Sequence, residues 1–564
     1  MKISENWLRT WVNPAIDSEK LSDQLTMLGL EVDELAPAAK PFTGVVVGEV
    51  LTVEQHPDAD RLRVTTVNIG SGEPLQIVCG APNVRAGMKA PVATIGAVLP
   101  GDFKIKKGKL RGIESQGMLC GASEIDLEDK IDGLLELPAD APVGMNIREY
   151  LDLDDNVIDI SITPNRGDCF SIRGIAREIG VINQLPVTAP EIKEVVATIS
   201  DEKKVVVSTE GCPRYLGRVI KNVNTKAVTP VWMERALARS GIRQHSILVD
   251  ITNYVLMELG QPLHAFDGGK VQGAVHVRQA TEAEKLVLLN EQEVELNEKV
   301  MVIADDEKAL AIAGIMGGLS SAVSDATTEI FLESAFFAPL HIAGRARSFG
   351  LHTDASQRYE RGVDFELPLI AMHRASQLIA ELAGGEFGPI TVAENAALLP
   401  TRDAIELNQA QVDQLLGYSV DSAFITDALS RLGCEVTVKA EGEWSVVPPS
   451  HRYDMVIYQD LIEEVARIHG YDNIQISLPV IDVKLAKYQD QFELGQLRQT
   501  AVTLGYQEAI SFSFADLKLE KQLNSHVKPL ALANPISSDL AVMRSTLLSS
   551  LIPCVQYNIN RQQS

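Results

Sequence analysis

Four carboxylates lie close together near the C-terminal end of the sequence, in the stretch SHRYDMVIYQDLIEEVARIHGY. They are Asp454, Asp460, Glu463 and Glu464. The last three have the i, i+3, i+4 spacing that places side chains on one face of a helix. Carboxylates this close repel one another unless a cation neutralises them, and oxygen ligands favour Mg²⁺ or Ca²⁺. The sequence therefore indicates a metal site; the alternative is an acidic first turn that complements the helix dipole.

A second group of candidates is spread over four motifs: GQPLHAFD at 260–267, GIMGG at 314–318, LESAFF at 332–337 and GLHTDASQRYERG at 350–362. Their candidate site residues are His264, Gly317, Gly318, Glu333, Thr353 and Ala355. Taken singly, each has an ordinary alternative: a core histidine, a surface glutamate, or glycines that serve only a tight turn. Only the set, in this order, suggests a pocket.

The third candidate is basic. The stretch FKIKKGKLRG places five cations in a short strand and turn, namely Lys104, Lys106, Lys107, Lys109 and Arg111. The whole chain has a formal net charge of -25. Because phosphate contacts need lysine and arginine, RNA binding would depend on a local basic patch of this kind. The alternative is a solvated hairpin whose lysines are merely exposed.

The elements that would position these residues divide the chain into several parts. At 564 residues the chain is too long for one core, so we expect about three to five domains. Leu21, Leu25 and Leu28 predict an amphipathic helix near the N-terminus. Short β-rich runs broken by glycine and proline between residues 44 and 126 predict a small barrel, and the following segment, 159–185, predicts a turn leading into a helix.

Residues 200–400 alternate strands and helices, so we expect one large α+β domain there, and a final αβ segment opens at Pro479. The six cysteines are far apart and contain no C-x-x-C pair, which suits reduced thiols. The sequence shows neither a signal peptide nor an apolar run of membrane-spanning length, so we expect a cytoplasmic protein without a membrane role.

Several stretches resemble known families. HPDADRLRV (56–64), VCGAPNV (78–84) and KLRGIESQGMLC (109–120) resemble the tRNA-binding OB-fold module found in several synthetases. With ISENWLRTWV, TPNRGDCFSIRGIAREIG and the motifs above, the chain is similar over its whole length to the β subunits of bacterial phenylalanyl-tRNA synthetases. The family continues into an RRM-like anticodon-binding domain that this sequence lacks, so the chain is expected to be C-terminally truncated.

The resemblance implies a multidomain α+β fold. It implies an N-terminal α/β domain from 1–39 plus 151–195, with a tRNA-binding OB-fold β-barrel inserted at 40–150. A central α+β editing domain of the B3/B4 type would follow at 200–400, then a small helical metal-binding domain of the B5 type at 401–477. The last part, 478–564, would be a partial class II synthetase-like antiparallel-sheet domain.

The resemblance also implies a function. The β subunit would support ATP-dependent charging of tRNA(Phe) by the α subunit and would itself hydrolyse mischarged Tyr-tRNA(Phe). A hydrophobic pocket rejects a ligand with one extra hydroxyl by only about 10²-fold, so a second sieve is needed. Glu333 would accept a hydrogen bond from the tyrosine hydroxyl, and His264 and Thr353 would orient the ester and water. The GIMGG backbone would approach the substrate closely, and Ala355 would line the pocket.

Partners follow from the same resemblance. The family is a heterotetramer of two α and two β subunits, with a Mg²⁺ site shared with the α subunit at the four carboxylates. Arg544, in NPISSDLAVMRSTLLSSLI, lies in a degenerate class II motif, where packing or subunit contact is the alternative to catalysis. Two other functions remain open: a tRNA-binding scaffold with an inactive pocket, and a free-standing hydrolase without a partner.

Overall fold

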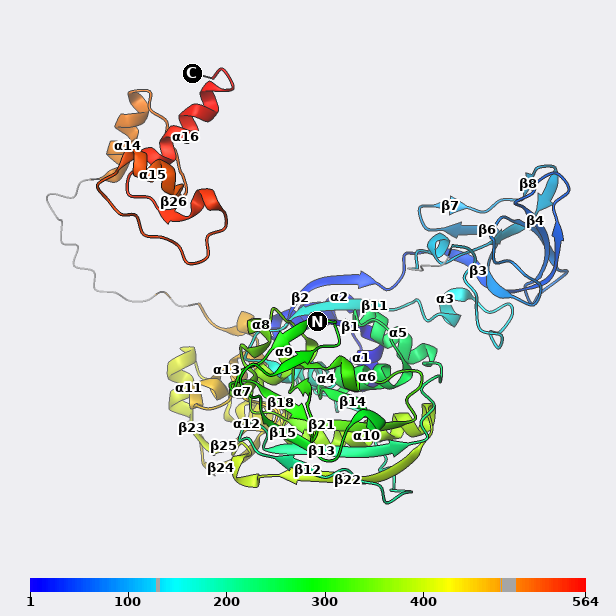
Figure 1. Cartoon of the computed structure of the whole chain (residues 1–564), viewed down its shortest axis with the longest axis horizontal. Coiled ribbons are helices and arrows are strands. Elements are labelled where there is room, and N and C mark those ends of the chain that lie inside the picture. The colour runs from blue at the N-terminus through cyan, green and yellow to red at the C-terminus, as the bar shows by residue number, and fades with distance from the viewer. Residues whose placement is uncertain (128–131, 477, 479–492, 564) are drawn as a thin grey trace. The chain divides into compact units, whose positions relative to one another are not determined.

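The computed structural model describes residues 1–127, 132–476, 478 and 493–563, and the chain forms two compact units, Met1–Ile476 and Ser477–Ser564 (Figure 1). Residues 479–492, where the last segment was expected to open, lie outside the described residues, as do 128–131 in the expected barrel. No helix in the described ranges combines the length and the apolar character needed to cross a membrane.

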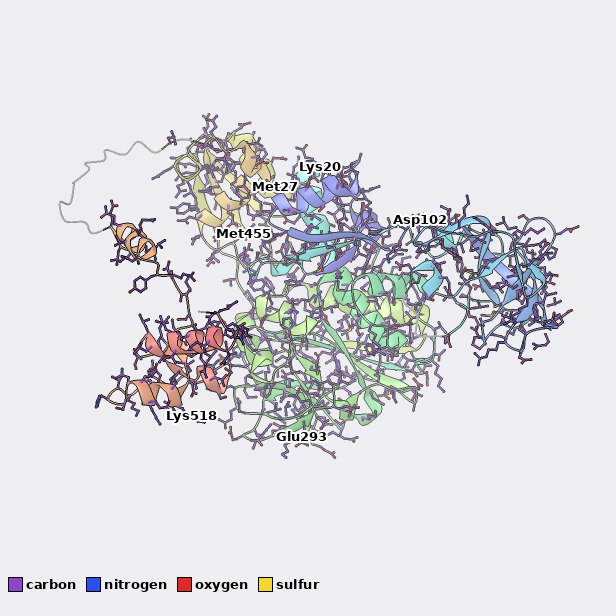
Figure 2. All side chains as sticks on the ribbon, turned by 90° about the horizontal axis from the view of Figure 1, so that it is seen from above. Lys20, Met27, Asp102, Glu293, Met455 and Lys518 are labelled. Carbon is purple, nitrogen blue, oxygen red and sulfur yellow. The ribbon has the colours of Figure 1, made fainter. Side chains whose placement is uncertain are left out.

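The chain begins with a small antiparallel sheet of order β1-β11-β2. Its strands are β1 (Lys2–Ser4), β11 (Asn156–Ser161) and β2 (Glu31–Pro37). It shares a core with helices α1 (Glu5–Trp11), α2 (Ser18–Met27) and α4 (Ile172–Asn183). The predicted apolar faces are confirmed: Leu21 and Leu25 of α2 are buried, while Lys20 and Met27 on the same helix are exposed (Figure 2). Residues before and after the barrel therefore build one core.

The inserted barrel is formed by a sheet of order β10-β6-β3-β4-β5. The strands are β3 (Thr43–Gln55), β4 (Arg63–Asn68), β5 (Leu75–Cys79), β6 (Lys89–Leu99) and β10 (Gly117–Leu119). The backbone N–H of Gln116 donates to the carbonyl of Gln76, which draws the two edge strands together. Strand β7 (Phe103–Lys104) pairs with β6, and β8 (Gly108–Leu110) forms a hairpin with β9 (Ile113–Ser115).

Two sheets form the central part of the first unit. One has the order β14-β21-β13-β22, with β14 (Leu263–Asp267), β21 (Glu329–Phe336), β13 (Arg214–Lys221) and β22 (Glu386–Glu394). The other has the order β12-β15-β18-β19-β20, with β12 (Val205–Val207), β15 (Val275–Gln279), β18 (Met301–Ala304), β19 (Ala309–Ile312) and β20 (Met316–Gly317).

Strand β21 is buried on both faces. Ile330 and Leu332 belong to a core shared with helices α6 (Ile247–Leu259) and α10 (Leu367–Leu382), whereas Phe331 and Ala335 belong to a core shared with the second sheet. Because side chains alternate along a strand, Glu333 lies on the face that carries Phe331 and Ala335. Its side chain is therefore directed into the layer between the two sheets.

The region expected to be a small helical domain at 401–477 contains a sheet, so that expectation is wrong. The antiparallel sheet has the order β23-β25-β24, from β23 (Ile405–Asn408), β25 (Glu443–Val447) and β24 (Glu435–Ala440). Helices α11 (Gln409–Leu416), α12 (Ser422–Arg431) and α13 (Tyr458–His469) complete it. Trp444 and Val446 alternate with more exposed residues along β25, the period of a half-buried strand.

In the second unit, the described residues hold three α-helices: α14 (Leu494–Thr503), α15 (Leu517–Leu523) and α16 (Leu548–Ile559). The antiparallel sheet expected there is limited, within the described ranges, to the pairing of β26 (Phe514–Ala515) with β27 (Val542–Met543). Many apolar side chains of this unit are exposed, among them Phe512, Val555 and Ile559.

Candidate functional site

A cavity of about 70 Å³ lies between the two central sheets. Four of the six predicted pocket residues line it: His264, Gly317, Glu333 and Ala355. Strands β14 and β21 supply the two titratable groups, β20 supplies the glycine, and helix α9 (Asp354–Arg361) supplies the alanine. Residues far apart in the sequence thus meet around one small space.

Glu333 occupies an apolar wall of this cavity and is 8% exposed. Burial raises the pKa of its carboxyl group to about 7, even though a hydrogen bond from Tyr215 lowers it. The phenolic Oη of Tyr215 donates to Oε2 at 2.7 Å. No described residue donates to Oε1, so that oxygen is free to accept from a ligand.

His264 is the register partner of Glu333 across the β14–β21 pair. Burial lowers the pKa of the imidazole to about 4, so the ring is neutral at physiological pH. Its Nε2 is buried and has no hydrogen-bond partner among the described residues. A neutral imidazole with a free nitrogen is able to bind a water molecule or a polar ligand atom.

Position 317 must be glycine because the imidazole ring of His264 approaches its backbone closely. A Cβ atom at position 317 would lie 2.5 Å from Cε1 and 2.8 Å from Nε2 of His264. Real side chains do not approach so closely, so any residue larger than glycine would displace the imidazole. The glycine-rich motif therefore serves the geometry of the pocket as well as the turn.

Gly318 and Thr353 do not line the cavity. A Cβ at Gly318 would lie 2.5 Å from the carbonyl oxygen of Leu310, so this glycine is needed for backbone packing. The Thr353 hydroxyl accepts from the backbone N–H of Ser356, which caps α9, and donates to the carbonyl of Ile315 at 2.9 Å. Both residues hold the 314–318 loop and α9 in place around the cavity.

Sequence reasoning missed two tyrosines of this site. Tyr215 contacts Glu333 from β13, and Tyr359 lines the cavity from α9 and donates to the carbonyl of Ala335 at 3.0 Å. Gln261 donates to Tyr359 Oη at 3.1 Å. Tyr359 lies within the motif at 350–362 and Tyr215 lies in none of the motifs, but residue type and spacing marked neither tyrosine, because their roles depend on tertiary contacts.

The four carboxylates near the C-terminal side of the first unit do not share one environment. Asp454 accepts two hydrogen bonds from Arg452, at 2.9 and 2.8 Å. Glu464 is buried and paired with Arg452 and Arg467. The other two differ again: Asp460 accepts from backbone N–H groups just before α13, at 2.7 and 2.8 Å, and Glu463 is exposed.

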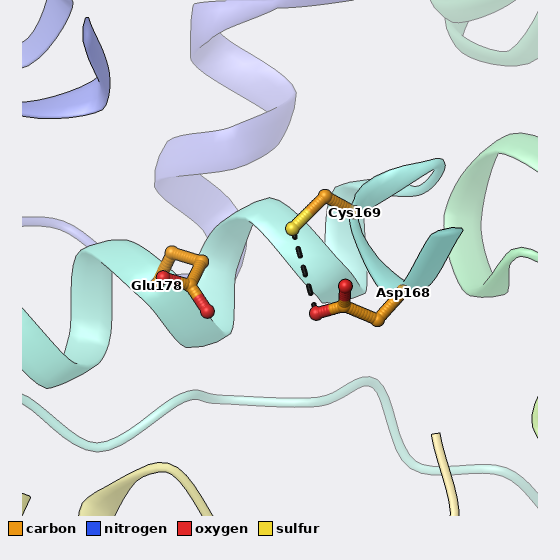
Figure 3. A group of neighbouring side chains, drawn as sticks. All are labelled: Asp168, Cys169 and Glu178. Atoms are coloured by element: carbon orange, nitrogen blue, oxygen red, sulfur yellow. Dashed lines mark hydrogen bonds between the residues drawn. The ribbon is translucent and has the colours of Figure 1, made fainter. Parts of the chain in front are cut away.

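The buried charges continue into the N-terminal part of the unit. Arg467 also pairs with Glu178 of α4, and Arg166 donates to Glu178 at 2.7 Å. Asp168, Cys169 and Glu178 hold their ligand atoms within 4.8 Å of one another, which is a metal-like grouping (Figure 3). Arg166 donates to all three, so a guanidinium already neutralises the cluster.

The basic stretch lies on the barrel surface beside a groove of about 540 Å³. Lys104 lies on β7, Lys109 on β8 and Arg111 in the turn before β9, and all are exposed. Lys106 lines the groove with Phe103, whose side chain is 59% exposed. Lys107 differs because its Nζ lies 2.7 Å from Oε1 of Glu114.

In the second unit, Arg544 has local partners. Its Nη1 donates to the Ser511 hydroxyl at 2.9 Å and to the Phe512 carbonyl at 3.2 Å. Its backbone N–H donates to the carbonyl of Ser513. These contacts join two segments of the unit and fit the packing role better than a catalytic one.

Family models match four successive parts of the chain. They are a tRNA binding domain at 45–146, a B3/4 domain at 211–384, a tRNA synthetase B5 domain at 405–471 and a phenylalanyl tRNA synthetase beta chain CLM domain at 474–564. The cavity lies within the B3/4 match and the carboxylates within the B5 match.

Two similar proteins are named phenylalanine--tRNA ligase beta subunit. The one from Acinetobacter baylyi is 82% identical over 564 residues, all of this chain and 71% of the relative. The one from Psychrobacter arcticus is 59% identical and is covered to the same extents. A solved N-terminal fragment of the phenylalanyl-tRNA synthetase beta subunit from Pyrococcus horikoshii covers 84% of this chain and 99% of its own, at 13% identity and a TM-score of 0.35.

The fold and these matches define a mixed α/β multidomain subunit of an aminoacyl-tRNA synthetase. The chain belongs to the family of phenylalanine--tRNA ligase beta subunits.

Proposed function

We propose that the cavity between the two central sheets hydrolyses tyrosine wrongly attached to tRNA(Phe), while the α subunit carries out the ATP-dependent aminoacylation. The observation that carries this proposal is a pair of polar atoms at the cavity, Glu333 Oε1 and His264 Nε2, which belong to register partners and have no hydrogen-bond partner among the described residues. The chain's membership of this synthetase family supplies the substrate class.

Selection would depend on the 4-hydroxyl of the substrate. Glu333 in its ionised form only accepts hydrogen bonds, and a tyrosyl ring brings a donor to it. A phenylalanyl ring would leave the buried carboxylate without that donor, which is unfavourable by about 1–3 kcal/mol or more for a charged group. A site built to bond a hydroxyl therefore rejects the analogue that lacks it.

His264 would hold the attacking water. Its neutral ring offers Nε2 as an acceptor or donor, depending on the tautomer. Gly317 lets the substrate ester approach this nitrogen, because it presents no side chain. We propose that Thr353 and Gly318 act by fixing the loop around the cavity, and that Ala355 keeps one wall small.

The barrel would bind tRNA through its basic groove. Lys104, Lys106, Lys109 and Arg111 are exposed cations, and Lys107 is partly neutralised by Glu114. Phe103 adds an exposed aromatic face, and bases stack on such faces without sequence preference. Contacts of this kind give general tRNA affinity rather than recognition of one sequence.

We further propose a Mg²⁺ site, shared with the α subunit, at Asp454, Asp460, Glu463 and Glu464. Their oxygen donors fit Mg²⁺ in type. Asp454 and Glu464 are already paired with arginines, so these two would bind the cation only together with Arg452 and Arg467. Mg²⁺ would supply neutralising charge at this surface, and the exposed Glu463 is its most accessible ligand.

The proposed assembly contains two α and two β subunits in the cytoplasm, a compartment that suits the six free cysteines. The proposed domains are 1–39 plus 151–195, 40–150, 200–400, 401–477 and 478–564. The four family matches support this division, since each falls within one of the last four segments apart from a short overlap at 474–477.

The test is deacylation of Tyr-tRNA(Phe) by the complex with the α subunit, comparing the native chain with Glu333→Ala. We expect rapid hydrolysis by the native complex and its loss in the variant, with aminoacylation of tRNA(Phe) retained in both. Absence of hydrolysis by a native complex that still charges tRNA(Phe) would contradict the proposal and leave a tRNA-binding scaffold.

A further inference from the structure

Tyr215 contacts the Glu333 carboxylate without lining the cavity. On the β13–β21 pair, Tyr215 is the partner of Ala335 and Gly217 is the partner of Glu333. Tyr215 and Glu333 are therefore diagonal neighbours on one face of the sheet, a separation that an aromatic side chain spans. The tyrosine is fully buried, so its ring is fixed by the core around it.

The hydrogen bond divides the two carboxylate oxygens between two roles. Oε2 accepts from Tyr215 Oη at 2.7 Å. No donor to Oε1 is found in the described part of the chain, and Glu333 lines the cavity. A carboxylate held at one oxygen has less freedom to turn, so its other oxygen keeps one direction.

We propose that Tyr215 is a positioning residue of the deacylation reaction: it holds one oxygen of Glu333 and leaves the other for the 4-hydroxyl of a tyrosyl ester. This inference rests on the proposed hydrolysis of mischarged tRNA. Tyr215 would touch neither the substrate nor the scissile ester, and would act through Glu333 alone.

The charges around Glu333 agree with this role. The titratable groups that face it are Tyr215 of β13, Cys212 just before β13, His264 of β14 and Tyr359 of α9. None is positively charged near neutrality, because burial lowers the pKa of His264 to about 4 and raises the pKa values of the other three. Burial raises the pKa of Glu333, and the hydrogen bond from Tyr215 opposes this effect by lowering the pKa.

The test is the pH profile of Tyr-tRNA(Phe) deacylation by the complex with the α subunit carrying Tyr215→Phe. Phenylalanine keeps the ring in the core and removes only the hydroxyl. Without that donor the pKa of Glu333 rises, so the acidic limb of kcat/KM should move to higher pH. At pH 7 we expect KM to rise roughly tenfold, the size of one hydrogen bond to a charged group, with kcat much less affected. Raising the pH to about 9 should restore most of the loss.

Two controls separate this role from a structural one. Tyr453→Phe removes the hydroxyl of another largely buried tyrosine, which does not line the cavity. That hydroxyl donates to the carbonyl of Val363 at 2.9 Å, and its removal should leave the pH profile unchanged. In a Glu333→Gln background, Tyr215→Phe should no longer shift the profile, because the glutamine side chain does not ionise. The melting temperature of each variant checks that it is folded.

The outcomes distinguish the two proposals. If the native complex hydrolyses Tyr-tRNA(Phe) and Tyr215→Phe keeps both its KM and its acidic limb, the role of Tyr215 is overturned while the hydrolysis stands. A loss of activity in Tyr215→Phe that is equal at every pH, or that persists in the Glu333→Gln background, also overturns it. If the native complex does not hydrolyse the ester, the proposed function itself fails.

Discussion

His264 and Glu333 are register partners across two antiparallel strands, and their side chains enter the same cavity. One group is neutral at physiological pH and the other titrates near it, since burial lowers the pKa of His264 to about 4 and raises that of Glu333 to about 7. Such a separation is typical of residues with different chemical roles in one site. An imidazole that binds water and a carboxylate that accepts a hydrogen bond from a hydroxyl group would be two such roles.

Gly317→Ala should abolish most of the deacylation activity. The added Cβ would lie 2.5 Å from Cε1 of His264 and would push the ring from its place. A displacement of about 1 Å in a positioned group can reduce the rate about 10²-fold. Single-turnover deacylation of Tyr-tRNA(Phe) measures this. Gly269→Ala is a matched control, since its Cβ would be 3.5 Å from the nearest neighbouring atom; equal rates for the two variants would refute the packing argument.

Glu333→Gln should stabilise the protein at alkaline pH. In the folded chain the pKa of Glu333 is about 7, against an ordinary value of 4.5, so burial of the ionised form destabilises the fold. This destabilisation grows as pH rises from 4.5 to 7 and is complete above 7, where it reaches up to about 3 kcal/mol. Melting curves at pH 4 and pH 8 should show a difference between variant and native chain only at pH 8. A variant that melts lower than the native chain at pH 8 would contradict the assignment.

Glu464→Gln and Glu463→Gln should have different effects. Glu464 is buried between two arginines, so removing its charge takes one carboxylate partner from each of them, while Arg452 keeps Asp454 and Arg467 keeps Glu178. The loss of hydrogen bonds between these charged groups should cost about 1.5–3 kcal/mol. Glu463 is exposed, and its replacement should change stability by less than about 0.5 kcal/mol. Chemical denaturation of both variants measures this difference.

The same pair of variants tests the Mg²⁺ proposal. Calorimetric titration of the complex with Mg²⁺ should show weaker binding in Glu463→Gln, a variant whose fold is intact. Unchanged Mg²⁺ affinity in that variant would remove Glu463 from the site. Loss of binding in Glu464→Gln alone would be explained by unfolding of the buried charge cluster.

The barrel lysines can be distinguished by the salt dependence of tRNA binding. Each phosphate contact contributes about 0.7–0.9 to the slope of log K against log salt concentration. Lys109→Ala and Arg111→Ala should each reduce the slope by nearly that amount, because both side chains are exposed and form no ion pair within the described ranges. Lys107→Ala should change it less, since Glu114 already neutralises that lysine. Equal slopes in all variants would exclude this hairpin as the contact.

The sequence predicted those parts of the fold that leave a local pattern. The spacing of Leu21 and Leu25 predicted an amphipathic helix, and both side chains are buried in the structure. The segment 159–185 predicted a turn leading into a second helix, which is α4, with Ile172, Ile175 and Ile179 buried. The short β-rich runs predicted the barrel strands. The sequence pattern did not reveal the sheet at 405–447. Only the alternation of buried and more exposed residues around Trp444 indicates a strand there.

The site was predictable to a smaller extent. The motifs brought forward His264, Gly317 and Glu333, which do meet at the cavity. Tyr215 lies 118 positions before Glu333, and its contact depends on the pairing of β13 with β21. Likewise, Arg467 and Glu178 meet across 289 positions. Contacts between residues so far apart in the sequence depend on how the strands and helices pack against one another, and neither residue type nor spacing predicts that packing.

The central claim is that Glu333 recognises the tyrosine hydroxyl, and a crystal structure of the complex with a non-hydrolysable 3′-tyrosyl-adenosine amide tests it most directly. The tyrosyl 4-hydroxyl should lie about 2.5–2.7 Å from Glu333 Oε1, a usual length for an O–H group bound to a carboxylate. Tyr215 should remain bonded to Oε2, and His264 Nε2 should face the linkage that replaces the ester. A tyrosyl ring bound elsewhere, or in this cavity with its hydroxyl bonded to another group, would contradict the account.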